Sequence, residues 1–148
     1  MKIVLGADHG GYLLKDYIRE QLEAAGHEVT DLGVNDSTSV DYPDQAAKVC
    51  EAYLSGDYTC GLLFCGTGIG ISIAANKIKG IRAAHVADAF SARMAREHNN
   101  ANIICLGGRT LGTELAWSIV EAYLSAEFVG DRHQRRIDKI TALEEQKE

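Results

Sequence analysis

The stretch GLLFCGTGIGISIAANK, residues 61–77, decides the fold of this 148-residue chain. Its first four residues are apolar or glycine and predict a short buried strand. The alternating glycines Gly66, Gly68 and Gly70 allow a tight turn from that strand into a helix. On both sides of this junction, short apolar runs alternate with longer amphipathic segments. That rhythm is typical of parallel strands joined by helices that cover both faces of a sheet.

The same alternation places five strands and their connecting helices along the chain. Strands are expected at residues 3–5, 29–32, 61–64, 81–86 and 102–106. Helices are expected at residues 12–25, 44–54, 71–77, 87–99 and 113–124, followed by a polar C-terminal helix from residue 131 and a charged tail, 144–148, that frays. We therefore predict a single domain, residues 1–148, with a doubly wound α/β fold and a mainly parallel five-stranded sheet.

Composition and charge exclude several classes of protein. Hydrophobic residues make up 46% of the chain and charged residues 24%, as in ordinary globular proteins. The net charge of -6 argues against nucleic acid as a partner. The uncharged stretch at residues 61–76 is too short and too often interrupted by glycine to span a membrane, and the first residues indicate a strand rather than a signal peptide. We expect a cytoplasmic protein with no membrane partner.

Four cysteines occur in the chain, at Cys50, Cys60, Cys65 and Cys105. They have neither the paired spacing of a zinc site nor the density of a secreted disulfide scaffold. We expect free thiols in a reducing compartment, with no metal and no cofactor.

Candidate functional residues follow the predicted strands. In doubly wound sheets a ligand lies beyond the carboxyl ends of the strands. The residues at those positions are Asp8 and His9, residues 65–70, Asp88 and Arg109.

The loop CGTGIG, residues 65–70, has the features of an anion-binding nest. Its glycines can aim several backbone N–H groups into one space, and the following helix adds the positive end of its dipole. The same field would favour the reactive thiolate form of Cys65. The alternative is a small buried residue that merely ends a strand, and we prefer that interpretation for Cys50, Cys60 and Cys105.

A dinucleotide-binding loop is a weaker interpretation of the same glycines. An acidic residue, Asp88, follows about twenty residues later, as such sites require. However, the spacing is GxGxG rather than GxGxxG, and the loop follows the third strand instead of opening the domain. Asp88 is better explained as the N-cap of the next helix.

Basic residues gather in the segment DRHQRR, residues 131–136. Arg132 and Arg136 are four positions apart and would share one face of a helix, which suits bidentate recognition of a phosphate. The alternative is a solvated basic face. For His98, at the end of a predicted helix, the alternative is a residue that satisfies the helix dipole. For Asp8, the alternative to a substrate-binding role is that of a helix N-cap.

Four segments in this order, LGADHGG, CGTGIGISIAANK, HNNANIICLGGR and RHQRRI, resemble the ribose-5-phosphate isomerase type B family over essentially the whole chain. That family includes galactose-6-phosphate isomerase subunits and allose-6-phosphate isomerases. The resemblance implies a three-layer, Rossmann-like α/β/α fold and a homodimer or dimer of dimers whose active sites are completed by the partner subunit. It also implies an aldose–ketose isomerase of the pentose phosphate pathway. The reaction would interconvert D-ribose 5-phosphate and D-ribulose 5-phosphate through an enediol.

The resemblance also assigns roles to residues. Cys65 would be the base that moves a proton between carbons 1 and 2, and His98 would open the sugar ring. Thr67 would bind the ring oxygen or orient the thiol. The backbone of the loop would stabilise the enediolate. The substrate-binding residues would be Asp8, His9, Tyr42, Gly66, Gly68, Ile69, Gly70, Asn99, Arg109, Arg132, His133 and Arg136.

Several alternatives stay open from the sequence. A six-carbon sugar phosphate is an alternative substrate, and a phosphate- or nucleotide-binding regulatory module and a NAD-dependent oxidoreductase are alternative functions. The group donated by the partner subunit is expected to be the His98–Asn99 pair or the helix that carries Arg132 and Arg136.

Overall fold

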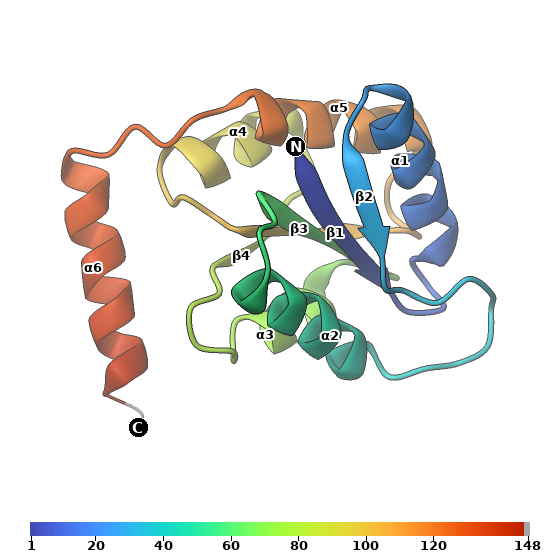
Figure 1. Ribbon diagram of the computed structural model, residues 1–148, viewed down its shortest axis with the longest axis horizontal. Coiled ribbons are helices and arrows are strands. Elements are labelled where there is room, and N and C mark those ends of the chain that lie inside the picture. The colour runs from blue at the N-terminus through green and yellow to red at the C-terminus, as the bar shows by residue number, and fades with distance from the viewer. Residues whose placement is uncertain (147–148) are drawn as a thin grey trace.

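The computed structural model describes residues 1–146, and within them five parallel strands form one sheet between two layers of helices (Figure 1). The strands are β1 (Lys2–Ala7), β2 (Glu28–Asp31), β3 (Cys60–Cys65), β4 (Ala83–His85) and β5 (Ile103–Gly107). The helices are α1 (Tyr12–Ala24), α2 (Tyr42–Ser55), α3 (Ile69–Ala75), α4 (Ala89–Glu97), α5 (Thr113–Ser125) and α6 (Arg132–Glu145). The sheet order is β2-β1-β3-β5-β4, so the predicted doubly wound α/β/α fold is confirmed.

Alternation of side chains along the strands builds two cores, one on each face of the sheet. In β3, Leu62 and Phe64 face the core covered by α1, α4 and α5, whereas Leu63 and Cys65 face the core covered by α2 and α3. Successive residues of a strand point to opposite faces, so a strand buried on both sides must be apolar throughout. That requirement explains why β3 could be recognised from residues 61–64.

The carboxyl edge of the sheet contains the switch point of the topology. Strand β1 lies between β2 and β3, and the helices that follow β1 and β3 cover opposite faces. Backbone hydrogen bonds join the loops at this edge: Gly108 N–H donates to the Cys65 carbonyl at 2.8 Å and Asp8 N–H to the Phe64 carbonyl at 3.1 Å. The loops after β1, β3 and β5 therefore form one connected surface.

Several predicted boundaries differ from the structure by one or two residues, and two of them have a clear local reason. Helix α2 starts at Tyr42 rather than at residue 44, because Pro43 is compatible with the first turn of a helix, where its missing N–H is not needed. Strand β4 is limited to residues 83–85, since Arg82 N–H donates to the side chain of Asn102 instead of joining the ladder.

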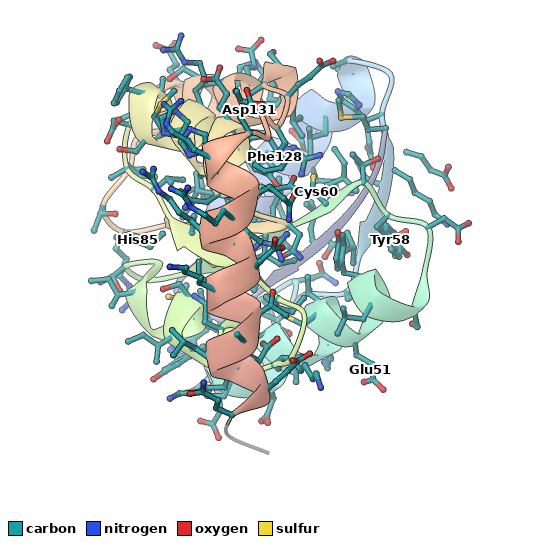
Figure 2. All side chains as sticks on the ribbon, turned by 90° about the vertical axis from the view of Figure 1, so that its left-hand side faces the viewer. Glu51, Tyr58, Cys60, His85, Phe128 and Asp131 are labelled. Atoms are coloured by element: carbon teal, nitrogen blue, oxygen red, sulfur yellow. The ribbon has the colours of Figure 1, made fainter. Side chains whose placement is uncertain are left out.

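Helix α6 stands beside the rest of the molecule and is reached by an extended connection (Figure 1; Figure 2 looks onto this helix, with Asp131 at its upper end). Its buried residues, His133 and Ile137, face inward. Farther along, α6 and residues 81–84 border an open cavity of about 710 Å³. The expectation of a frayed tail is wrong for Glu144, whose carboxylate accepts from Gly80 N–H at 3.1 Å; residues 147–148 lie outside the described part. None of the helices within residues 1–146 has the length and hydropathy needed to cross a membrane.

Candidate active site

Cys65 is the last residue of β3 and is 4% exposed. Gly68 N–H donates to its Sγ at 3.1 Å. The backbone of Gly68 has a φ of +80°, in the left-handed region that glycine adopts without strain. This turn directs an N–H group back at the sulfur and so stabilises negative charge there. Ile69 N–H donates to Thr67 Oγ1 at 3.2 Å, which fixes the Thr67 hydroxyl within the same loop.

The other three cysteines are buried and serve the core. Burial raises the pKa of Cys50 to about 11 and that of Cys60 to about 12. Burial also raises the pKa of Cys105 well above its usual value. These groups stay protonated at neutral pH, which agrees with their interpretation as structural residues.

Asp8 and His9 lie next to the Cys65 loop at the end of β1. Asp8 is buried, and its Oδ1 accepts from Gly10 N–H at 2.8 Å. The N-cap of α1 is Gly11, so the interpretation of Asp8 as a helix cap is wrong. His9 Nδ1 accepts from Val40 N–H at 3.2 Å, which places the proton of the neutral ring on Nε2.

Tyr42 and Arg109 border the same loop. A Cβ added at Gly70 would lie 2.7 Å from Tyr42 Cζ, so only glycine leaves room for the ring at that point. Arg109 N–H donates to the Gly66 carbonyl at 2.9 Å. The guanidinium lies over Gly66, because a Cβ there would be 3.3 Å from Arg109 Nη1.

His85 belongs to this surface although sequence reasoning missed it. Its Cδ2 would lie 2.8 Å from a Cβ at Gly68. The signal was its position at the carboxyl end of a predicted strand, the same signal that identified Asp8 and Cys65.

Asp88 serves as the N-cap of α4. Its Oδ1 accepts from Ser91 N–H at 2.7 Å, and its Oδ2 accepts from the Ser91 hydroxyl at 2.9 Å. The Ser91 N–H is also the main reason why the pKa of Asp88 is lowered. The carboxylate is therefore engaged with its own helix, which disfavours the dinucleotide interpretation.

The remaining predicted residues form a second cluster where α4 ends and α6 begins. The ring of His98, the C-cap of α4, stacks on that of His133 with 4.2 Å between centroids. Burial lowers the pKa of His133, and the positive charges of His98, Arg132 and Arg136 lower it further, against a smaller opposite effect of Asp131. His133 therefore favours its neutral form, and Arg132 and Arg136 provide the positive charge that recognition of a phosphate requires. Asn99 lies next to His98 in the chain, and its carbonyl accepts from Arg82 Nε at 3.1 Å.

The two clusters lie at opposite edges of the sheet. Because β4 and β5 are parallel, α4 must return from the carboxyl edge to the amino edge, where His98 precedes β5. The five residues of β5 alone span roughly 16 Å. In Figure 1, α6 stands on the left, whereas the arrow of β1 points to the lower right, away from α6. One chain therefore does not bring His98, Asn99, Arg132, His133 and Arg136 to Cys65.

Chemically, the first cluster can hold an anionic oxygen on backbone N–H groups beside the thiol of Cys65. The second cluster can bind a dianion such as a phosphate. Within residues 1–146, no group of three histidine, cysteine or carboxylate side chains is arranged to hold a metal ion.

Comparison with known proteins places the chain in a family. The sequence pattern of the Ribose/Galactose Isomerase family matches residues 3–140. Ribose-5-phosphate isomerase B of Escherichia coli is 46% identical over 146 residues, which cover 99% of this chain and 98% of that protein. The structure of Clostridium thermocellum ribose-5-phosphate isomerase B superposes with a TM-score of 0.98 at 52% identity, with all of both chains covered.

A further solved structure contains a ligand. Ribose-5-phosphate isomerase B of Mycoplasma genitalium, with bound ribulose-5-phosphate, has a TM-score of 0.92 and 43% identity, covering 98% of this chain and 97% of that chain. Pattern, sequence and structure agree over nearly the full length. This chain belongs to the ribose/galactose isomerase family.

Proposed function

We propose that the chain is an isomerase that interconverts D-ribose 5-phosphate and D-ribulose 5-phosphate. The observation that carries the proposal is the hydrogen bond of 3.1 Å from Gly68 N–H to Cys65 Sγ, in a glycine loop bordered by Asp8, Tyr42 and Arg109. It places a sulfur that can act as the base next to backbone N–H donors, the two components that an enediolate reaction needs. Relatives of 46% and 52% identity carry the name of this activity.

In the proposed reaction, the Cys65 thiolate removes the proton from carbon 2 of open-chain ribose 5-phosphate. The electron pair forms the carbon 1–carbon 2 double bond, and the carbonyl oxygen becomes an enediolate that the N–H groups of residues 66–70 stabilise. Cys65 then delivers its proton to carbon 1 while a proton moves from the oxygen on carbon 2 to the oxygen on carbon 1. The thiolate is restored, so the step needs no redox partner.

The functional unit in this proposal is a homodimer, with His98, Asn99, Arg132, His133 and Arg136 of one subunit completing the site around Cys65 of the other. Exposed apolar residues on both surfaces of the proposed interface support the homodimer. On α3, next to the Cys65 loop, Ile69 and Ile73 are 50% and 58% exposed, and Ile140 and Leu143 of α6 are also exposed. Contact between α6 and α3 of a partner would cover these side chains. The four free cysteines suit the reducing cytoplasm, which we propose as its location.

Activity is tested with ribose 5-phosphate, allose 6-phosphate and galactose 6-phosphate in a coupled assay. We expect the highest kcat/KM for ribose 5-phosphate and a loss of about a thousandfold or more in Cys65→Ala, because the reaction would lose its base. A higher kcat/KM for a six-carbon substrate would replace ribose 5-phosphate in this proposal. Full activity of Cys65→Ala would overturn it.

The shared site is tested by mixing Cys65→Ala chains with His98→Asn chains. If His98 acts across the interface, each mixed dimer contains one site with both residues intact, and activity returns. No recovery in verified mixed dimers would contradict action in trans.

A further inference from the structure

Lys15 of α1 is completely buried, and its ammonium group is surrounded by oxygen atoms. Nζ donates to both carboxylate oxygens of Asp31, at 2.9 and 2.7 Å, and lies 3.2 Å from Asp16. It also donates to the carbonyl of Val34 at 2.8 Å and to Oδ1 of Asn35 at 3.0 Å. An ammonium has three N–H donors, so these partners saturate it. Lys15 is therefore unsuited to proton transfer.

Two of these partners belong to the segment that leads into the proposed active site. Residues 32–41 contain neither helix nor strand, and residues 35–39 are exposed. Lys15 holds the beginning of this segment at Val34 and Asn35. Its end meets the site, because Val40 N–H donates to His9 Nδ1 at 3.2 Å and Tyr42 lies over Gly70.

We propose that Lys15 is a positioning residue that acts through residues 32–41 to hold Val40 and Tyr42 in place, and thereby fixes the tautomer of His9. This inference rests on the proposed function for its effect on catalysis. Without the ammonium, Asn35 loses this partner, and Val34 keeps only the long bond of 3.5 Å from its N–H to the Ala7 carbonyl. The free part of the segment then begins earlier, and fewer molecules hold Val40 against His9. A site that is formed in only a fraction of the molecules binds its substrate more weakly by that fraction.

Burial of a paired lysine does not by itself indicate a gain in stability, because the cost of dehydrating the ions offsets much of their attraction. What distinguishes Lys15 is that it contacts two neighbouring residues of a loop as well as carboxylates. Arg19 provides a comparison within the same chain. It pairs with Asp31 at 3.7 Å, and this ion pair does not involve Val34 or Asn35.

The test is Lys15→Met, with Arg19→Met as the matched control, and three measurements. In Lys15→Met we expect faster amide hydrogen exchange of Val40, by about tenfold, and loss of the single Nε2–H tautomer of His9 in nitrogen-15 ring spectra. We also expect KM for ribose 5-phosphate to rise about three- to tenfold while kcat changes less than about twofold. Arg19→Met should match the parent in all three.

Unchanged exchange, tautomer and KM in folded Lys15→Met would overturn the proposal. Should that variant fail to fold, the double variant Lys15→Met/Asp31→Asn also removes the charge of the carboxylate that has lost its ammonium partner. The same three measurements on the double variant then test the role of Lys15. Failure of both to fold would also overturn it, because Lys15 would then hold the fold rather than the loop. Hydrogen exchange of Val40 and the ring spectra of His9 need no substrate. These two measurements therefore test the role of Lys15 even if the parent protein has no isomerase activity, a result that would contradict the proposed function alone.

Discussion

The imidazole rings of His98 and His133 are stacked, with centroids 4.2 Å apart and planes inclined by 10°. This contact joins the end of α4 to the first turn of α6. Close to it, Val129 N–H donates to the carbonyl of Glu97 at 3.0 Å. The orientation of α6, and with it the placement of Arg132 and Arg136, therefore depends on contacts made by His133 and Val129.

We expect the docking of α6 to weaken as the pH falls below about 6.5, the ordinary pKa of histidine. The pKa of His133 is lowered in the folded chain, so the unfolded chain takes up its proton first as the pH falls. The contribution of His133 to stability is thus complete above about pH 6.5 and is lost as the pH drops toward the folded pKa. Hydrogen exchange in α6, corrected for the intrinsic effect of pH, measures the change between pH 7.5 and pH 5.

The matched variants separate this effect from that of a second histidine. His133→Phe keeps a ring for stacking but cannot titrate, so exchange in α6 should become nearly independent of pH. His27 also has a lowered pKa, caused by burial and by the N-terminal amino group. His27→Gln should alter the pH dependence of global unfolding but not that of α6. The same loss of protection in His133→Phe would contradict the prediction.

Arg132 and Arg136 should contribute to substrate affinity through the phosphate. Loss of either charge-assisted contact is expected to cost about 1.5–3 kcal/mol, or roughly a ten- to hundredfold rise in KM for ribose 5-phosphate. Arg135→Ala is the control, because it removes a neighbouring exposed arginine from the same helix. Unphosphorylated ribose should be turned over equally poorly by all three variants and the parent. Unchanged kinetics in Arg132→Ala/Arg136→Ala would mean that these residues form only a solvated basic face.

The fold could be predicted from sequence because its strands are buried on both faces and its turns contain glycine. The start of β4 was predicted too early, because Arg82 N–H donates to the side chain of Asn102 and not to a backbone carbonyl of the neighbouring strand. Cys65 and Asp8 were found from their positions after strands. For the partner subunit's contribution, the sequence left two alternatives, the His98–Asn99 pair or the helix of Arg132 and Arg136. The structure separates both from Cys65, because α4 returns to the amino edge of the sheet and α6 begins beside its end. Lys15 was missed because a lysine on an amphipathic helix ordinarily indicates a solvated face.

Gly70→Ala should impair substrate binding through Tyr42. The new Cβ would lie 2.7 Å from Tyr42 Cζ, and the half-exposed ring would turn away from the loop rather than unfold the chain. We expect KM to rise about tenfold, which corresponds to a loss of about 1.4 kcal/mol of binding free energy. The thermal stability should be nearly unchanged. In a Tyr42→Ala background, Gly70→Ala should have little additional effect. Gly112→Ala is the control, because nothing lies within 4 Å of its added Cβ. Additive effects of Gly70→Ala and Tyr42→Ala on KM would contradict an action of Gly70→Ala through the Tyr42 ring.

The proposed roles of Cys65 and His98 can be separated by the step that each performs. Ribulose 5-phosphate cannot close a furanose ring, because the hydroxyl group that would attack its carbonyl carries the phosphate. A residue that opens the ring is therefore not needed for this substrate to react. Cys65 must remove the proton from carbon 1 in every turnover that starts from ribulose 5-phosphate.

We expect Cys65→Ala to lose the exchange of the carbon-1 proton of ribulose 5-phosphate with solvent deuterium. His98→Asn should keep much of this exchange while losing turnover of cyclic ribose 5-phosphate. The ratio of forward to reverse kcat/KM cannot distinguish the roles, because the equilibrium constant fixes it for every variant. Exchange measured before net conversion does distinguish them, since it reports proton removal alone. Folding and substrate binding by each variant are verified separately. If Cys65→Ala and His98→Asn lose exchange equally with folding and binding intact, His98 takes part in proton transfer itself, and the division of roles is wrong.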